Sequence, residues 1–158
     1  MNYRHAGKQD LNLLVESRLQ FTYGMRDIQV ESSDKEYEKL KENCERYFRC
    51  ALEEDTCDVI LAEENGECVA TGIIFYYLSV PSVFNVAGKN AYITSLYVKP
   101  EYRRLGIGTT ILKHLINCAS QRGYDIVMLS ASELGKPIYE KIGFQEIQNS
   151  MIYDGRNK

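Results

Sequence analysis

The sequence predicts an α/β fold in which a mixed, mostly antiparallel central sheet is flanked by helices on both faces. Three observations carry this prediction. The dipeptide Asn65-Gly66 separates two β-prone runs, which is typical of an antiparallel hairpin. Residues 91–131 have the pattern strand, helix, strand, which implies a parallel pair of strands in the same sheet. Two stripes of apolar residues at helical spacing precede the hairpin and can cover a face of that sheet.

The first half of the chain contains one short strand, two helices and the hairpin. Asp10 is a candidate N-cap of the first helix, and Gly24 follows its last turn. Ser33 and Glu36 have the spacing of a capping box and should start the second helix. The predicted ranges are residues 2–6 for the strand, 11–24 and 33–54 for the helices, and 57–62 and 68–77 for the hairpin.

The second half begins with a long loop, which has room for an element that faces a substrate. A central strand follows, then a helix that stops at Gly123, a continuous apolar strand of the fully buried type, and a short helix with Pro137 in its first turn. One or two strands should close the sheet. The predicted ranges are residues 79–90 for the loop, 91–98 for the central strand, 109–123 for the long helix, 124–131 for the apolar strand, 134–142 for the short helix and 144–153 for the closing strands.

Length and composition indicate one domain over residues 1–158, with the apolar content of 44% and charged content of 26% of an ordinary globular protein. No window is apolar enough for a membrane span, and the N-terminus lacks the apolar segment of a secretory signal, which predicts a cytoplasmic protein. The net charge of −3 gives no electrostatic case for nucleic acid as a partner.

The five cysteines predict free thiols. They form no CxxC pair and have no histidine at metal-ligand spacing, so the sequence predicts neither a disulfide framework nor a metal site. They are Cys44, Cys50, Cys57, Cys68 and Cys118.

A glycine motif lies between the central strand and the long helix. Gly106 and Gly108 would let a ligand approach backbone N–H groups that have no intrahelical partner, and the helix dipole favours an anion there. Arg103 and Arg104 add positive charge to this loop, and we expect Lys113 and Arg122 to lie on the same side. The spacing therefore predicts a diphosphate site.

Two other phosphate motifs fit less well. A P-loop needs Gly-Lys-Ser/Thr, but Thr109 follows Gly108 directly. A dinucleotide fingerprint needs a third small residue where Ile111 stands. A nucleotide-binding domain is therefore the weaker alternative.

The residues AYITSLYVKPEYRRLGIGTTIL (91–112) and ASELGKPIYEKIGF (131–144) resemble the core of the GNAT superfamily of acyl-CoA-dependent N-acetyltransferases. Arg103, Gly106 and Gly108 fit the family pattern Arg/Gln-x-x-Gly-x-Gly/Ala, and residues 139–144 fit its Tyr-Glu-Lys-x-Gly-Phe signature. The resemblance implies a GNAT-like sheet with a splayed parallel strand pair, and an acyltransferase that takes acetyl-CoA as co-substrate and uses no metal.

The resemblance also implies the site residues. Tyr139 would give a proton to the departing CoA thiolate, and Ser132 would bind the pantetheine arm where relatives often have asparagine. The pantetheine arm would run beside Leu96, Tyr97 and Val98, and the pyrophosphate would rest on Arg103, Arg104, Leu105, Gly106, Ile107, Gly108 and Thr109.

The general base stays open. Many relatives have a carboxylate early in the central strand, where this chain has Tyr92. Glu63, Tyr92 acting through a water, and a chain of waters are all candidates. Family members splay two strands at about the level of Tyr97 and Val98, where a backbone N–H would stabilise the oxyanion.

The acceptor is an unidentified small-molecule or peptide amine. Acidic residues outnumber basic ones between Glu31 and Glu67, which favours a cationic acceptor but equally fits a solvated acidic face. Self-pairing through the C-terminal strands would make a homodimer, which the sequence leaves open. The main alternative function is a non-catalytic acyl-CoA-binding or sensor domain, against which the retained Tyr139 speaks.

Overall fold

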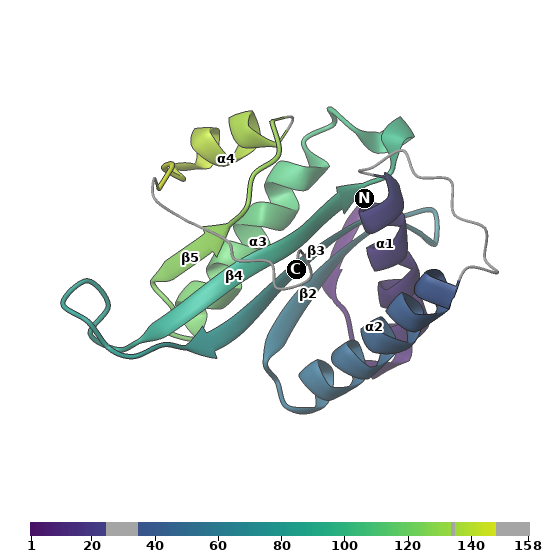
Figure 1. Ribbon diagram of the computed structural model, residues 1–158. Helices are drawn as coiled ribbons and strands as arrows, with labels where there is room; N and C mark the ends of the chain where they lie inside the picture. The colour runs from purple at the N-terminus through teal and green to yellow at the C-terminus, as the bar shows by residue number, and fades with distance from the viewer. Residues whose placement is uncertain (25–34, 134, 148–158) are drawn as a thin grey trace, which may run out of the picture.

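The computed structural model describes residues 1–24, 35–133 and 135–147. These residues form one five-stranded sheet in the order β1-β2-β3-β4-β5, between two layers of helices (Figure 1). The strands are β1 (Asn2–His5), β2 (Cys57–Glu64), β3 (Glu67–Leu78), β4 (Lys89–Val98) and β5 (Ile126–Leu129). The helices are α1 (Leu11–Gly24), α2 (Lys35–Glu53), α3 (Ile107–Gln121) and α4 (Lys136–Ile142), with 3₁₀ turns η1 (Lys8–Asp10) and η2 (Pro100–Tyr102).

The sheet is mixed, as predicted. β1 to β4 pair antiparallel with their neighbours, and β4 and β5 pair parallel. The β2–β3 turn has Asn65 at φ 52° and Gly66 at φ 83°, which is the left-handed pair that a tight hairpin with twisted strands requires. The hairpin signal in the sequence therefore located this turn correctly.

Two apolar cores lie on the two faces of the sheet. α1 and α2 cover one face, where Leu14, Val15 and Phe48 pack against residues of β2 and β3. α3 covers the other face, where Ile111, Leu112 and Leu115 pack against β2, β3 and β4, and α4 joins this side (Figure 1). Within the part of the chain that the structure describes, no helix is long and apolar enough to cross a membrane.

Gly72 of β3 allows α3 to lie close to the sheet. A Cβ built at this position would overlap the γ2 methyl of Ile111 and come within 3.0 Å of Cδ1 of Leu115. We expect Gly72→Ala to lower the free energy of unfolding by about 1–3 kcal/mol, which is typical of overpacking a core. Urea unfolding followed by circular dichroism would measure the change.

A second variant isolates the cause of that loss. Ile111→Leu removes the γ2 methyl but keeps the side-chain volume, so the double variant Gly72→Ala/Ile111→Leu should be more stable than the sum of the two single changes predicts. Strict additivity would show that the contact with Ile111 is not the cause.

The predicted loop after β3 is the tip of a long hairpin. β3 ends at Leu78 and β4 begins at Lys89. The tip of this hairpin projects from the body of the domain (Figure 1). Several large apolar side chains in and beside this tip are exposed. They are Leu78, Val80, Val83, Phe84 and Val86.

The strand predicted over residues 124–131 is shorter in the structure. β5 contains only Ile126–Leu129, and its side chains are half-buried because it is the edge strand of the described sheet. Tyr124 instead packs on Tyr76, with 4.7 Å between the ring centroids. Residues 144–147 form no strand, and the rest of the predicted closing segment lies outside the described residues, as does Ser33 of the predicted capping box.

Asp10 has a different role from the predicted N-cap. It lies in η1, and its Oδ2 accepts hydrogen bonds from the backbone N–H of Gly7 and from Arg4, both at 2.8 Å. The hydrogen bonds from Arg4 lower the pKa of the Asp10 carboxyl. Asp10 therefore fixes the turn between β1 and α1.

The cysteines are free, as expected. Cys57 and Cys118 are buried, and burial raises the pKa of each thiol to about 11.

Candidate active site

The sheet opens between its two parallel strands. Pairing of β4 with β5 begins at Asn90 with Ile126 and ends at Ile93 with Leu129. β4 continues for five residues, 94–98, without a ladder partner in β5. The opening therefore starts earlier along β4 than the level of Tyr97 and Val98 that the family resemblance suggested.

A β-bulge lies where the opening starts. The register of β3 against β4 shifts between Ile73, which faces Ser95, and Ile74, which faces Ile93, so Thr94 is the extra residue. Its carbonyl accepts a hydrogen bond from Nη1 of Arg18 on α1 at 3.4 Å. A bulge re-aims the backbone groups of a strand, which frees them to contact a ligand.

The glycine motif forms the tight turn into α3. Arg104 has φ 63° and Gly106 has φ 80°, so the chain turns through two left-handed residues before Ile107 starts the helix. Gly106 is the N-cap and provides no side-chain hydrogen bond. The first N–H groups of this 15-residue helix therefore point at the site with the positive end of the helix dipole behind them.

Gly108 joins three parts of the site. A Cβ built on it would lie 3.4 Å from Cδ1 of Ile138, 3.6 Å from Cγ2 of Val98 and 3.8 Å from Cδ2 of Leu96. The N-terminus of α3, the open end of β4 and the helix α4 thus meet at this glycine. The side chains of Leu96 and Val98 face this core, so only their backbone is available to a ligand along the opened edge.

The basic residues are divided between the two ends of α3. Arg103 and Arg104 are exposed beside the glycine turn, and Nε of Arg103 donates to the carbonyl of Val98 at 3.1 Å. Arg122 lies at the other end of α3, where it binds Asp55 and Asp58. The expectation that Arg122 serves the phosphate site was wrong, because 15 helical residues separate the two ends by about 22 Å.

The remaining residues of the predicted loop differ in exposure. Leu105 is exposed and Ile107 is buried in the core under α3, while Thr109 is half-buried in the first turn. Ile107 therefore anchors the turn, and its backbone rather than its side chain can face a ligand.

Tyr139 lies on α4 next to Ile138. It is half-buried, its ring packs edge-on against Phe144 at 6.0 Å between centroids, and burial raises the pKa of its phenol. Among the residues that the structure describes, none hydrogen bonds to the Tyr139 hydroxyl. The phenol keeps its proton at neutral pH and is available to donate it.

Ser132 holds the start of α4. Its Oγ accepts a hydrogen bond from the N–H of Gly135 at 3.2 Å, and its carbonyl accepts from the N–H groups of Gly135 and Lys136, both at 2.9 Å. Its hydroxyl proton remains available to a ligand, since the bond to Gly135 uses the oxygen as acceptor.

The two side-chain candidates for the general base lie in different surroundings. Tyr92 on β4 shares a 2.6 Å hydrogen bond with Oγ of Ser130, and its ring packs on Phe75. Glu63 lies on β2, and β3 separates it from β4. Nη2 of Arg4 lies 2.7 Å from Oε1 of Glu63, so the two side chains form an ion pair. The ion pair favours a structural role for Glu63, whereas Tyr92 lies on β4 itself, two residues before the unpaired segment that begins at Thr94.

Sequence reasoning missed Arg18 and the bulge at Thr94. Arg18 is one of several polar residues in α1, and no local residue pattern marks a bulge inside a β-branched run. Both follow from how α1 and β3 pack on β4, which is a tertiary feature.

The sheet opens between two parallel strands and an uncapped helix N-terminus lies at the opening, which is the arrangement that the family resemblance implies. Known proteins agree with it. The profile of the "Acetyltransferase (GNAT) family" matches residues 22–144. The chain therefore belongs to the GNAT family of acetyltransferases.

Several curated relatives carry acetyltransferase names. The chain is 34% identical over 88 residues to a thialysine N-epsilon-acetyltransferase of Bos taurus, which covers 54% of this chain and 49% of that protein. It is 30% identical over 117 residues to an N-acetyltransferase of Methanocaldococcus jannaschii, which covers 72% of this chain and 50% of that protein. The chain spans about half the length of these relatives.

Solved structures match over nearly the whole chain. A predicted acetyltransferase from Clostridium acetobutylicum, crystallised with acetyl-CoA, superposes with a TM-score of 0.84 and 33% identity over 97% of this chain and 95% of that one. A GCN5-related N-acetyltransferase from Ralstonia eutropha superposes with a TM-score of 0.81 at 21% identity over 97% of both chains, which supports the fold.

Proposed function

We propose that this chain transfers an acetyl group from acetyl-CoA to a primary amine by direct attack. The observation that supports it most is the meeting of three parts at Gly108: the uncapped N-terminus of α3, the open end of β4 and the helix with Tyr139. A donor held there would have its phosphates on the helix N-terminus and its thioester beside β4.

The pyrophosphate of acetyl-CoA suits the glycine turn. Free N–H groups of α3, the helix dipole and the exposed guanidinium of Arg104 all favour an anion, and an arginine can donate two parallel hydrogen bonds to phosphate oxygens. We assign Arg103 to Thr109 to the pyrophosphate on this basis. The unpaired edge of residues 96–98 is assigned to the pantetheine arm, with Ser132 as a further hydroxyl contact.

The chemistry needs three groups. The neutral amine attacks the thioester carbon, and the carbonyl oxygen takes up negative charge that a backbone N–H of the opened strand would stabilise. Collapse of the intermediate breaks the carbon–sulfur bond, and Tyr139 gives its proton to the thiolate to release CoA. The amine loses one proton, which a water hydrogen bonded to the Tyr92 hydroxyl would pass to solvent, and Tyr139 regains its proton from solvent.

The acceptor is proposed only as a primary amine. Relatives are named for acetylation of thialysine, of glucosamine 6-phosphate and of the alanine of a ribosomal protein, and aminoglycoside acetyltransferases are among the structural neighbours. The shared chemistry of these names is an amino group, not a scaffold. A cationic small molecule or a peptide would both fit this class.

Two measurements test the proposal. Calorimetry should show that the protein binds CoA but not ATP. Release of free CoA thiol from acetyl-CoA should then increase with one member of an amine panel that contains lysine analogues, amino sugars, polyamines and a peptide N-terminus.

The outcomes separate the alternatives. CoA binding with no thiol release from any amine would favour the acyl-CoA-binding or sensor domain. Binding of ATP without binding of CoA would overturn the assignment of the loop.

A further inference from the structure

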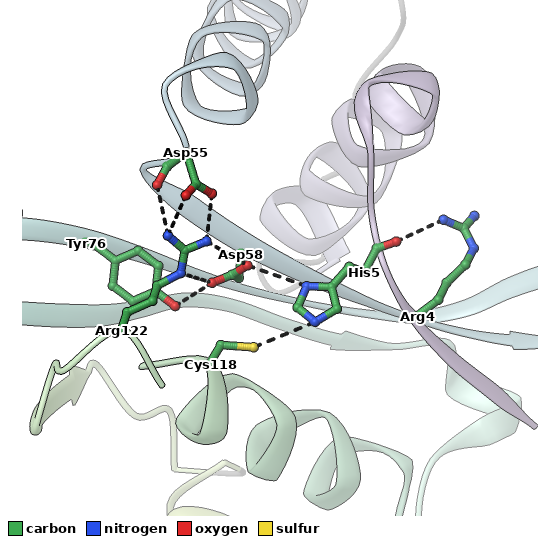
Figure 2. A network of polar contacts seen from close by, with 7 residues as sticks. All are labelled: Arg4, His5, Asp55, Asp58, Tyr76, Cys118 and Arg122. Atoms are coloured by element: carbon green, nitrogen blue, oxygen red, sulfur yellow. Dashed lines mark hydrogen bonds and ion pairs between the residues drawn. The ribbon is translucent and has the colours of Figure 1, made fainter. Parts of the chain in front are cut away.

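We propose that His5, Asp58 and Cys118 form a binding site for a divalent transition metal, with zinc as the natural ion. The three residues come from the end of β1, the start of β2 and the last turns of α3, and Figure 2 shows them facing one another. One ligand atom from each lies within 4.8 Å of the others. The site lies at the far end of α3 from the glycine turn, so the inference does not depend on the proposed function.

The ligand atoms lie near the spacing that a tetrahedral ion needs, but the two short contacts of His5 involve its two different nitrogens. Nδ1 of His5 lies 3.5 Å from Oδ1 of Asp58, and Nε2 of His5 lies 4.0 Å from Sγ of Cys118. Zinc bonds of about 2.0–2.3 Å at tetrahedral angles place ligand atoms about 3.5 Å apart. Only one nitrogen of the ring can bind a single ion, so the His5 side chain, 62% of which is exposed, would turn away from one of these two contacts to complete the site.

The surroundings hold Asp58 in a ligating orientation. Its Oδ2 accepts hydrogen bonds from the Tyr76 hydroxyl at 2.7 Å and from Nε of Arg122 at 2.8 Å. Its Oδ1 has a longer contact of 3.3 Å with Nη2 of Arg122 and faces His5 (Figure 2). Metal-ligating carboxylates are typically oriented by such partners on the other oxygen.

The charges of the cluster also suit a divalent cation. Asp55 binds the guanidinium of Arg122 through both carboxylate oxygens, at 2.7 and 2.8 Å, and so offsets its positive charge. Asp55, Asp58 and Arg122 together leave one net negative charge. Binding of the metal to Cys118 as a thiolate releases one proton and adds a second negative charge, which a divalent ion neutralises.

The ligand types favour zinc over magnesium or calcium. A thiolate and an imidazole are ligands of zinc and its neighbours, whereas the hard alkaline-earth ions take oxygen. Three protein ligands leave a fourth position to water on the side of the exposed His5. The sequence predicted no metal because it contains no local ligand spacing, but here 113 residues separate His5 from Cys118 and the fold brings them together.

Cobalt and zinc titrations test the site. The full chain, treated with a chelator and desalted, is titrated with Co²⁺, and a thiolate-to-cobalt charge-transfer absorption should saturate at one ion per chain. Zn²⁺ should displace the Co²⁺ with the same stoichiometry. Cys118→Ser should abolish the charge-transfer band, and His5→Ala should weaken Zn²⁺ binding at least 10- to 100-fold, since even indirect ligand partners contribute that much.

Matched variants serve as controls. Cys50→Ser and His114→Ala change an exposed cysteine and an exposed histidine elsewhere, and both should bind like the wild type. His5 is exposed, so His5→Ala should keep the fold even if Cys118→Ser does not. Failure of the wild type to bind one ion per chain, or unchanged binding by His5→Ala and Cys118→Ser, would overturn the proposal.

Discussion

Tyr139→Phe is expected to lower turnover by about 10²- to 10⁴-fold while the affinity for CoA stays nearly unchanged, because loss of a general acid removes a proton transfer and not a binding contact. The ring would still pack on Phe144 and fill the same volume in α4. Turnover would be measured as the release of CoA thiol with a saturating amine, and affinity by calorimetry with CoA.

Tyr124→Phe is the matched control. Tyr124 packs on Tyr76 beyond the C-terminal end of α3, so loss of its hydroxyl should leave turnover within a small factor of the wild type. A wild-type rate for Tyr139→Phe, under conditions where chemistry limits the rate, would remove Tyr139 from the mechanism. A large rise in the dissociation constant for CoA would instead make it a binding residue.

The pH dependence gives a second readout for the same residue. Burial raises the pKa of the Tyr139 phenol above its ordinary value, so its neutral, proton-donating form persists through neutral and moderately alkaline pH. If Tyr139 is the acid, the alkaline fall in activity of the wild type should be absent from the Tyr139→Phe variant.

The local elements of the fold could be predicted because each has a local physical cause. The turn at Gly66 requires left-handed backbone, and the amphipathic stripe of α3 needs a sheet to cover it. The failed predictions concern tertiary placement. Tyr124 is of a type common in buried strands, but it packs on Tyr76 before β5 begins. Asp10 is of a type common at helix N-caps, but its carboxylate binds Arg4.

The residues of the candidate site also fall into those that the sequence could locate and those that it could not. The glycine turn and the position of Tyr139 follow from short motifs, so the sequence could locate them. The assignment of Arg122 to the phosphate site failed because it left out the length of the helix: Arg122 lies in the last turn of the predicted helix 109–123, about 20 Å from the glycine turn. Its partner Asp55 lies in the turn before β2, and its partner Asp58 lies at the start of β2. Only the packing of α3 on the sheet brings the three residues together.

Gly108→Glu is expected to raise the dissociation constant for CoA by about 100-fold or more. A Cβ built on Gly108 would lie less than 4 Å from side-chain carbons of Ile138, Val98 and Leu96, which leaves no room for a longer side chain in that direction. A glutamate side chain would press α4 and the end of β4 away from the turn, and its carboxylate would add negative charge beside the proposed pyrophosphate site. A like charge alone costs several kcal/mol, and about 1.4 kcal/mol corresponds to a tenfold change in affinity.

Gly108→Ala separates these effects from loss of the glycine itself. The added Cβ would make ordinary contacts at 3.4 Å and beyond, and Gly108 lies inside α3, so alanine suits its backbone. We expect this variant to bind CoA nearly as the wild type does. Calorimetry with CoA on variants whose folding is checked by thermal melting would decide. If a folded Gly108→Glu protein bound CoA with wild-type affinity, the turn between β4 and α3 would not hold the pyrophosphate.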